Sequence, residues 1–151
     1  MSFLKTDTIE INGQPLLLTE LSGLERYEHM DYSTKLQSEA PAEPEPLAEG
    51  ASPVEHETRL FALQKWSQAW AKLSYLAQVN LVAYGIKGFE AVQGQSQEDR
   101  RRWVQENLSD QSVVKVHNAV GYLSGMVFEP KDDMDEPASE TEPAEPIDPK
   151  A

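Results

Sequence analysis

The three histidines, His29, His56 and His117, are the side chains best suited to acid–base chemistry or metal binding near neutral pH. Their separations match no common metal-ligand spacing, and the motif H-E-x-x-H is absent. Cysteine is absent too, so neither a thiolate metal site nor a disulfide framework is expected. Most carboxylates stand in proline-rich segments that provide no fold to raise a pKa. These residue types therefore indicate neither catalysis nor a metal or other cofactor.

Two aromatic or basic clusters suit ligand binding instead. Trp66, Trp70 and Tyr84 fall at helical spacing, which would fit an aromatic ligand box but is more typical of a helix core. The run 100–102 is three arginines beside Trp103, which could stack on single-stranded nucleic acid. The net charge of −13 would repel phosphates, so we predict no nucleic-acid partner. We interpret the arginines as a solvated helix face or a contact for acidic residues of a partner or of the chain's own tails.

The negative charge is concentrated in two segments that share the sequence PAEP, at residues 41–44 and 143–146. Residues 38–55 contain five acids and no base, and residues 129–151 contain nine acids against two lysines. Both segments are rich in proline and poor in the apolar residues that would offset the entropy cost of ordering. We therefore predict a disordered acidic linker or loop over 38–55 and a disordered tail over 129–151.

The remaining residues, 1–37 and 56–128, are nearly neutral and are predicted to form one domain. Asn12-Gly13 between two strand-like runs is typical of a type I′ hairpin turn, which needs positive φ at both positions. Ser22 and Glu25 match a capping box for a helix that reaches about residue 37. Further helices are expected over 57–92, over 96–108 and from 109 or 110 to about 126.

The predicted fold class is thus mainly α: a small helical domain with an N-terminal β-hairpin and a disordered acidic, Pro-rich C-terminal tail. In the first helix, Leu24, Tyr27, Met30 and Leu36 give a loosely amphipathic pattern. No stretch approaches the roughly 18 apolar residues of a membrane span, and the first residues lack the features of a signal peptide. We therefore expect no membrane association.

Three stretches of the sequence resemble one family when they are taken in order. Phe3-Leu4-Lys5-Thr6 leads into the Asn-Gly turn, and Leu18-Thr19-Glu20-Leu21-Ser22-x-Leu24-x-Arg26-x-Glu28-His29 follows. Tyr122-Leu123-Ser124-Gly125-Met126 stands near the end of the predicted fold, before the acidic tail with its second PAEP. This order is similar to the minor tail protein G family of phage lambda, the tail assembly chaperones of long-tailed phages.

The resemblance implies a non-catalytic protein that binds the long tape measure protein in the host cell cytoplasm and is absent from the mature virion. It also implies a second product, made by ribosomal frameshifting, in which a T domain fused to the same body recruits major tail protein. We expect the tail to be the linker to that domain, with Lys150 at the frameshift junction. The alternative is a structural minor tail component that is retained in the virion, and an immunoblot of purified virions would distinguish the two.

A tape measure protein is long and largely helical, so its chaperone is expected to offer an apolar helical surface. Residues 60–92 carry more apolar helical surface than a small two-helix packing would bury, although a homo-oligomer interface would use the same excess. The predicted partner-binding residues are Leu63, Trp66, Trp70, Leu73, Leu76, Tyr84, Tyr122, Leu123 and Met126.

Overall fold

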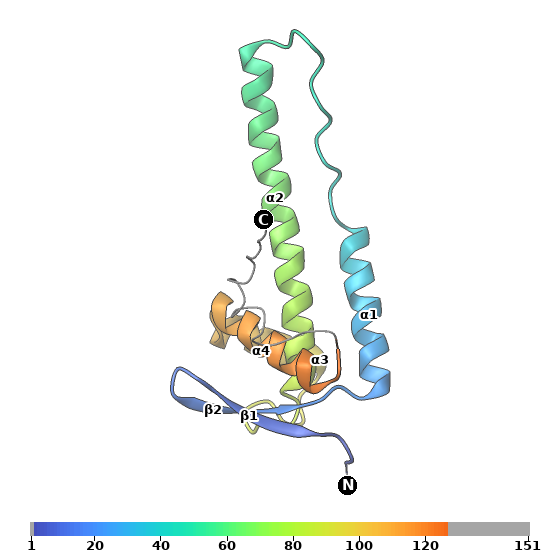
Figure 1. Cartoon of the computed structure of the whole chain (residues 1–151), viewed down its shortest axis with the longest axis vertical. Coiled ribbons are helices and arrows are strands. Elements are labelled where there is room, and N and C mark those ends of the chain that lie inside the picture. Colours follow the sequence, from blue (N-terminus) through green and yellow to red (C-terminus); the bar gives the residue numbers. More distant parts are fainter. Residues whose placement is uncertain (1, 127–151) are drawn as a thin grey trace, which may run out of the picture.

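The computed structural model describes residues 2–126 and shows four helices and a two-stranded hairpin within them (Figure 1). The predicted disorder of the tail and the predicted junction at Lys150 lie outside the described residues. The mainly helical class with an N-terminal hairpin is confirmed. The elements are β1 (Thr6–Ile11), β2 (Gln14–Thr19), α1 (Gly23–Ser38), α2 (Pro53–Gly85), α3 (Gln97–Asn107) and α4 (Asp110–Leu123).

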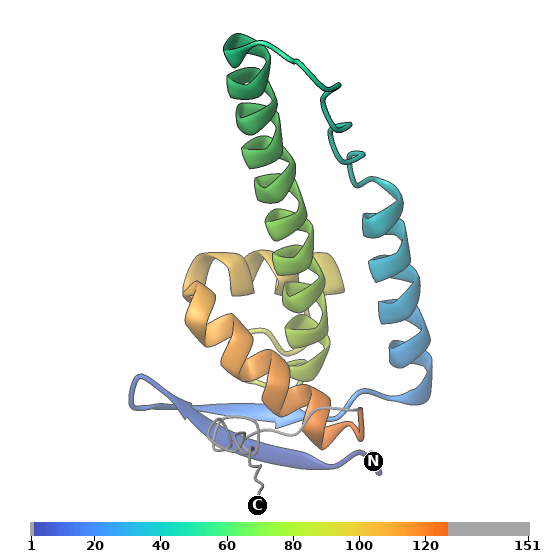
Figure 2. The same ribbon diagram turned by 45° about the horizontal axis from the view of Figure 1, so that its top comes forward.

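The hairpin turns where the sequence predicts it. Asn12 and Gly13 have φ values of 52° and 82°, as a type I′ turn requires, and Thr6 pairs with Thr19 at the open end. Leu16 and Leu18 of β2 are buried, so one face of the hairpin closes the core. Figure 2 shows α4 lying across the hairpin, which needs such support because an isolated pair of strands is only marginally stable.

A serine caps the start of each of the four helices. The hydroxyl of Ser22 and that of Ser52 each accept a hydrogen bond from the N–H three residues on, and each serine is part of a capping box. The other two caps are Ser96 and Ser109, which stand where the sequence predicts these two helices to begin.

The long helix differs from its predicted bounds of 57–92 at both ends. It begins at Pro53, inside the segment predicted to be a disordered linker, because Ser52 and Glu55 form a capping box around a proline in the first turn. It ends at Gly85, and residues 86–95 form turns that lead to α3. The segment 39–52, which contains neither helix nor strand, connects α1 to α2; we call it the strap.

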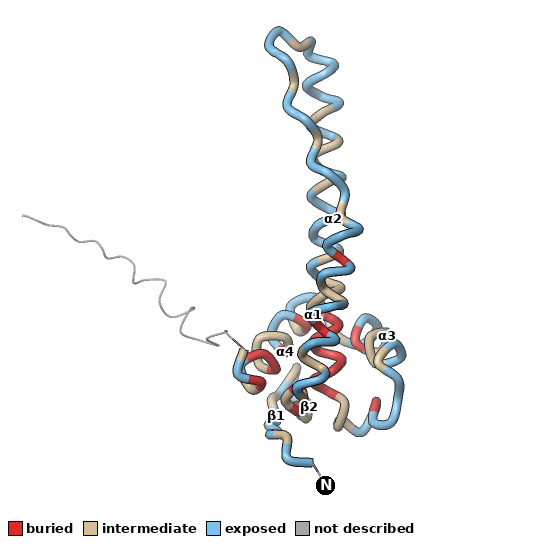
Figure 3. The backbone as a smooth tube through the Cα atoms, turned by 90° about the vertical axis from the view of Figure 1, so that its right-hand side faces the viewer, coloured by how far each residue is buried: buried red, intermediate tan, exposed pale blue. Residues whose placement is uncertain are grey.

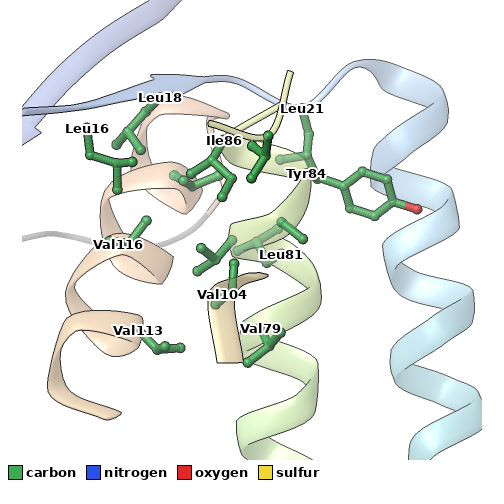
Figure 4. Packing of buried hydrophobic residues seen from close by; sticks show 14 residues of the cluster. Leu16, Leu18, Leu21, Val79, Leu81, Tyr84, Ile86, Val104, Val113 and Val116 are labelled. Carbon is green, nitrogen blue, oxygen red and sulfur yellow. The ribbon is translucent and has the colours of Figure 1, made fainter. Parts of the chain in front are cut away.

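The core lies at the end of α2 nearest the hairpin, where α2, α3, α4 and β2 meet (Figure 4). Every buried residue of α2 falls within Val79–Gly85. Val113 and Val116 of α4 face Leu81 across this core, which the side chains of β2 cover. About the first three quarters of α2, residues 53–77, extend beyond the core with exposed or half-buried side chains (Figure 3). We call this segment the outer half of α2, because it points away from the core.

The apolar pattern predicted for α1 does not face the core. Leu24, Tyr27 and Met30 are exposed, with 69%, 68% and 56% of their surface accessible, whereas His29 and Leu36 are buried. The helix is oriented by polar contacts of its other face, described below, and these contacts outweigh the apolar stripe. No helix within residues 2–126 is long and apolar enough to span a membrane.

Gly85 allows α2 and α4 to approach each other closely. A methyl group at this position would lie 2.4 Å and 2.6 Å from the two Cγ atoms of Val120. We therefore expect Gly85→Ala to lower the free energy of unfolding by about 1–3 kcal/mol, the usual cost of overpacking a core. Urea unfolding followed by circular dichroism measures this change.

Gly23→Ala is the matched control, because Gly23 is also helical but has no atom within 4 Å of the added methyl group. It should be neutral or stabilise the protein by less than about 1 kcal/mol. Equal effects of the two substitutions would contradict the close α2–α4 contact.

Candidate partner-binding surface

Asn80 joins three helices through its buried amide. Its Nδ2 lies 3.0 Å from Nδ1 of His29 in α1, and its Oδ1 accepts hydrogen bonds from Gln97 and Arg101 of α3, each at 3.0 Å. The backbone carbonyl of Asn80 accepts a further bond of 2.9 Å from Gln97. Because arginine can only donate, Oδ1 must face Arg101, and the amide N–H therefore donates to His29.

The position of Asn80 explains the charge state of His29. A ring nitrogen that accepts a hydrogen bond must be unprotonated. Burial, with a smaller contribution from the nearby His117, lowers the pKa of His29 to about 4. Burial also lowers the pKa of His117, a half-buried residue of α4. His29 thus contributes to the structure as a neutral side chain.

Two of the three consecutive arginines connect helices, which corrects their interpretation as a solvated face. Arg100 donates from Nε to the carbonyl of Ala83 at 3.0 Å, near the end of α2. Arg101 bonds Asn80 and also stacks over the ring of Tyr32 in α1, 4.7 Å from its centroid. Only Arg102 is exposed, where it pairs with Asp99 of its own helix.

A second set of polar contacts joins α1 to the end of α4. Ser124 accepts a hydrogen bond at its hydroxyl from the N–H of Leu21, at 2.9 Å, and at its carbonyl from Arg26. Ser124 is itself buried. The two stretches that carry the family resemblance, 18–29 and 122–126, therefore contact each other directly.

Further members of the first stretch hold α1 on α2. Lys87 pairs with Glu25 and donates to the carbonyl of Glu20 at 3.0 Å. Tyr84 donates to Glu28 at 3.1 Å, and burial together with this acceptor raises the pKa of Tyr84 to about 12. These residues are architectural, since each one fixes the position of a helix.

The structure divides the predicted partner-binding residues into three groups. Tyr84 lies in the core, with its hydroxyl directed to α1 (Figure 4), so it offers little surface to a partner. Trp70 and Tyr122 are exposed, the former in the outer half of α2 and the latter in α4. The others are half-buried: Leu63, Trp66, Leu73 and Leu76 on α2, and Leu123 and Met126 at the end of α4.

The outer half of α2 also carries exposed apolar residues beyond the predicted partner-binding residues. Leu60 and Phe61 are 59% and 60% exposed, and Val54 is exposed near the first turn. Leu60 and Leu63 line an open cleft of about 420 Å³ together with Pro46 and Leu47 of the strap. Leu60 and Phe61 lie within the helix predicted over 57–92, but only the structure shows that this part of α2 extends beyond the core. Val54 lies before the predicted start of the helix.

The strap lies along this half of α2 and is held by two side chains. Nε1 of Trp66 donates to the carbonyl of Pro41 at 3.1 Å. Arg59 donates to the carbonyls of Glu45 and Pro44, at 2.8 Å and 3.3 Å. The outer half of α2 and the strap thus form one elongated surface that exposes apolar side chains.

Within residues 2–126 no three His, Asp or Glu side chains come together in a way that could hold a metal ion. The protein has a compact body, whose helices are joined by polar side chains, and a helix that projects from it. The projecting helix suits contact with another chain.

Comparison with known families gives this arrangement its context. The family model described as bacteriophage lambda tail assembly chaperone, TAC, protein G matches residues 2–145. The match covers nearly the whole chain, so the chain belongs to the family of lambda tail assembly chaperone protein G, and the resemblance seen in the sequence is confirmed. Chaperoning is a non-catalytic role. No curated protein and no solved structure matches the chain.

The depressed pKa of His29 predicts acid sensitivity. Between pH 6.5 and about 4 the unfolded chain binds a proton at this residue that the folded chain does not, so stability falls as the pH is lowered through this window. His29→Gln keeps an acceptor for Asn80 but cannot titrate. We expect it to reduce the loss of unfolding free energy between pH 7 and pH 5 by on the order of 1 kcal/mol.

Urea unfolding at the two pH values measures the difference. His56→Gln, at an exposed position of α2, controls for the loss of one histidine. An acid dependence of His29→Gln equal to that of the unsubstituted chain would contradict a neutral, hydrogen-bonded His29.

Proposed function

We propose that this tail assembly chaperone binds the tape measure protein through the outer half of α2. One observation carries the proposal: the outer half contributes no buried residue to the core, yet it exposes Leu60, Phe61 and Trp70. A helix with apolar side chains facing solvent suits packing against a helix of another chain. Leu63, Trp66, Leu73 and Leu76 would widen the same contact.

This binding would keep an aggregation-prone helical partner soluble until the tail tube forms around it. We propose that it takes place in the host cell cytoplasm and that the chaperone is absent from the mature virion. Tyr122, Leu123 and Met126 would then form a smaller, separate contact at the end of α4.

We further propose that the same body is also made as a frameshifted fusion with a T-like domain that recruits major tail protein. Family membership supports this step, and so does the position at which α4 ends. Ser124 contacts α1 and the hairpin side of the body, whereas the outer half of α2 extends to the opposite end of the molecule (Figure 1). A domain joined beyond Met126 would leave the outer half of α2 free.

The double substitution Leu60→Lys and Phe61→Lys tests the binding surface. It places two charges where apolar contact is proposed, so we expect at least a tenfold loss of affinity for the tape measure protein while the fold is kept. Co-purification of the two proteins from cells that express both gives the readout, with circular dichroism as the test of folding.

Leu24→Lys with Tyr27→Lys is the matched control, because these side chains are apolar and at least as exposed, on α1. If the control pair abolishes binding and the α2 pair does not, the surface is assigned to the wrong helix. If the α2 pair instead dissociates an oligomer without changing tape measure binding, the surface serves self-association.

The nucleotide sequence tests the fusion. We expect a slippery heptamer that overlaps the codons for Pro149, Lys150 and Ala151, because lysine codons are A-rich and permit re-pairing after a −1 slip. An overlapping −1 frame should encode the T-like domain. A −1 frame that closes within a few codons, without a slippery heptamer, would contradict the proposed fusion.

A further inference from the structure

The strap presents one copy of a tetrapeptide that occurs twice in this chain. Pro41-Ala42-Glu43-Pro44 lies in the strap, and Pro143-Ala144-Glu145-Pro146 repeats it near the other end of the sequence, outside the described residues. Only the first copy has a described position. The contacts that hold it show what the site recognises.

Those contacts are hydrogen bonds to backbone carbonyls of the strap. Trp66 bonds the carbonyl of Pro41, the first residue of the tetrapeptide, and Arg59 bonds the carbonyl of Pro44, its last residue. Arg59 also bonds the carbonyl of the next residue, Glu45. Because all three acceptors are backbone carbonyls, any chain with the same extended course presents the same acceptors.

Proline-rich segments suit such a site. Proline favours an extended polyproline conformation with solvent-facing carbonyls, so little entropy is lost when donors beside an aromatic ring bind it. The cation of Arg59 also favours an acidic segment, and each copy of the tetrapeptide carries a glutamate. The second copy therefore has the same prolines, backbone carbonyls and glutamate as the copy that is bound.

We propose that the Arg59–Trp66 face of α2 is a docking site for the PAEP sequence, and that the C-terminal copy exchanges with the strap copy within one chain. This inference goes beyond tape measure binding and does not depend on it. In the fusion proposed above, docking would shorten the free part of the linker between the body and the appended domain.

The chain is long enough for the exchange. Gly85 lies against Val120, so the end of α4 is near the end of α2. From Gly85 to Trp66 the helix rises by about 28 Å. The residues from Met126 to Pro143 would span about 53 Å as polyproline helix and roughly 22 Å as a flexible coil. A tether of this length keeps the second copy at an effective concentration of about a millimolar, enough for a weak peptide contact.

Four full-length chains test the exchange. One is unaltered, one has residues 41–44 replaced by Gly-Ser-Gly-Ser, one has residues 143–146 replaced in the same way, and one has both replacements. The readout is the rate of hydrogen exchange of the Trp66 indole N–H, whose NMR signal is assigned by Trp66→Phe. The indole signal of Trp103, which packs on Phe89 in the body, reports that each variant is folded.

We expect each single replacement to leave the exchange of the Trp66 N–H within about twofold of the unaltered chain. The double replacement should raise the rate at least tenfold. Equal rates for the strap variant and the double variant would overturn the proposal, because the tail copy would then not occupy the site. Retained protection in the double variant would overturn it too, since the site would not require PAEP.

A spin label gives a second measurement. The sequence has no cysteine, so Thr141→Cys places a single label beside the C-terminal copy. In the strap variant it should broaden the Trp66 signal more than the Trp103 signal, and to the same extent when the protein is diluted tenfold. Broadening that fades on dilution would assign the docked copy to another molecule and overturn exchange within one chain.

Discussion

The buried amide of Asn80 is the constraint on which the rest of the structure depends. A buried polar side chain destabilises a fold unless it finds hydrogen-bond partners, and Asn80 is only 1% exposed. Its amide nitrogen donates to His29 of α1 and its amide oxygen accepts from Gln97 and Arg101 of α3, so one side chain links the three helices. The neutral state of His29 and the half-buried positions of Gln97 and Arg101 follow from this requirement.

With the helices fixed at one end of α2, the other end is free of the core. The outer half of α2 is stabilised by a proline-containing capping box, by residues that favour helix, and by the contacts of Arg59 and Trp66 with the strap. Segments with few buried contacts are those that open most readily. The same property that makes this half the less stable part leaves its apolar side chains available to a partner.

Local signals in the sequence were enough to predict the hairpin and most helix starts. Asn12-Gly13 and the serines at 22, 96 and 109 act within a few residues, so their effect does not depend on the fold. The start of α2 was missed although Ser52 and Glu55 are the same kind of signal, because they stand in a proline- and glutamate-rich composition. The roles of Arg100 and Arg101 could not be predicted, since their acceptors are 17 and 21 residues away in sequence and on another helix.

The main surface proposed to bind the partner, on the outer half of α2, lies outside the stretches that carry the family resemblance. The proposed smaller contact of Tyr122, Leu123 and Met126 is the exception, because these residues belong to the stretch 122–126. The stretch 18–29 contains the helix cap of α1 and Glu25, which pairs with Lys87. Ser124 joins this stretch to the end of α4 through its bonds with Leu21 and Arg26. Leu60, Phe61 and Trp70 make none of these contacts. Neither Leu60 nor Phe61 contacts the polar side chains that hold α1 on the body. Substitutions on the outer half of α2 can therefore alter the surface presented to a partner while those polar contacts are kept.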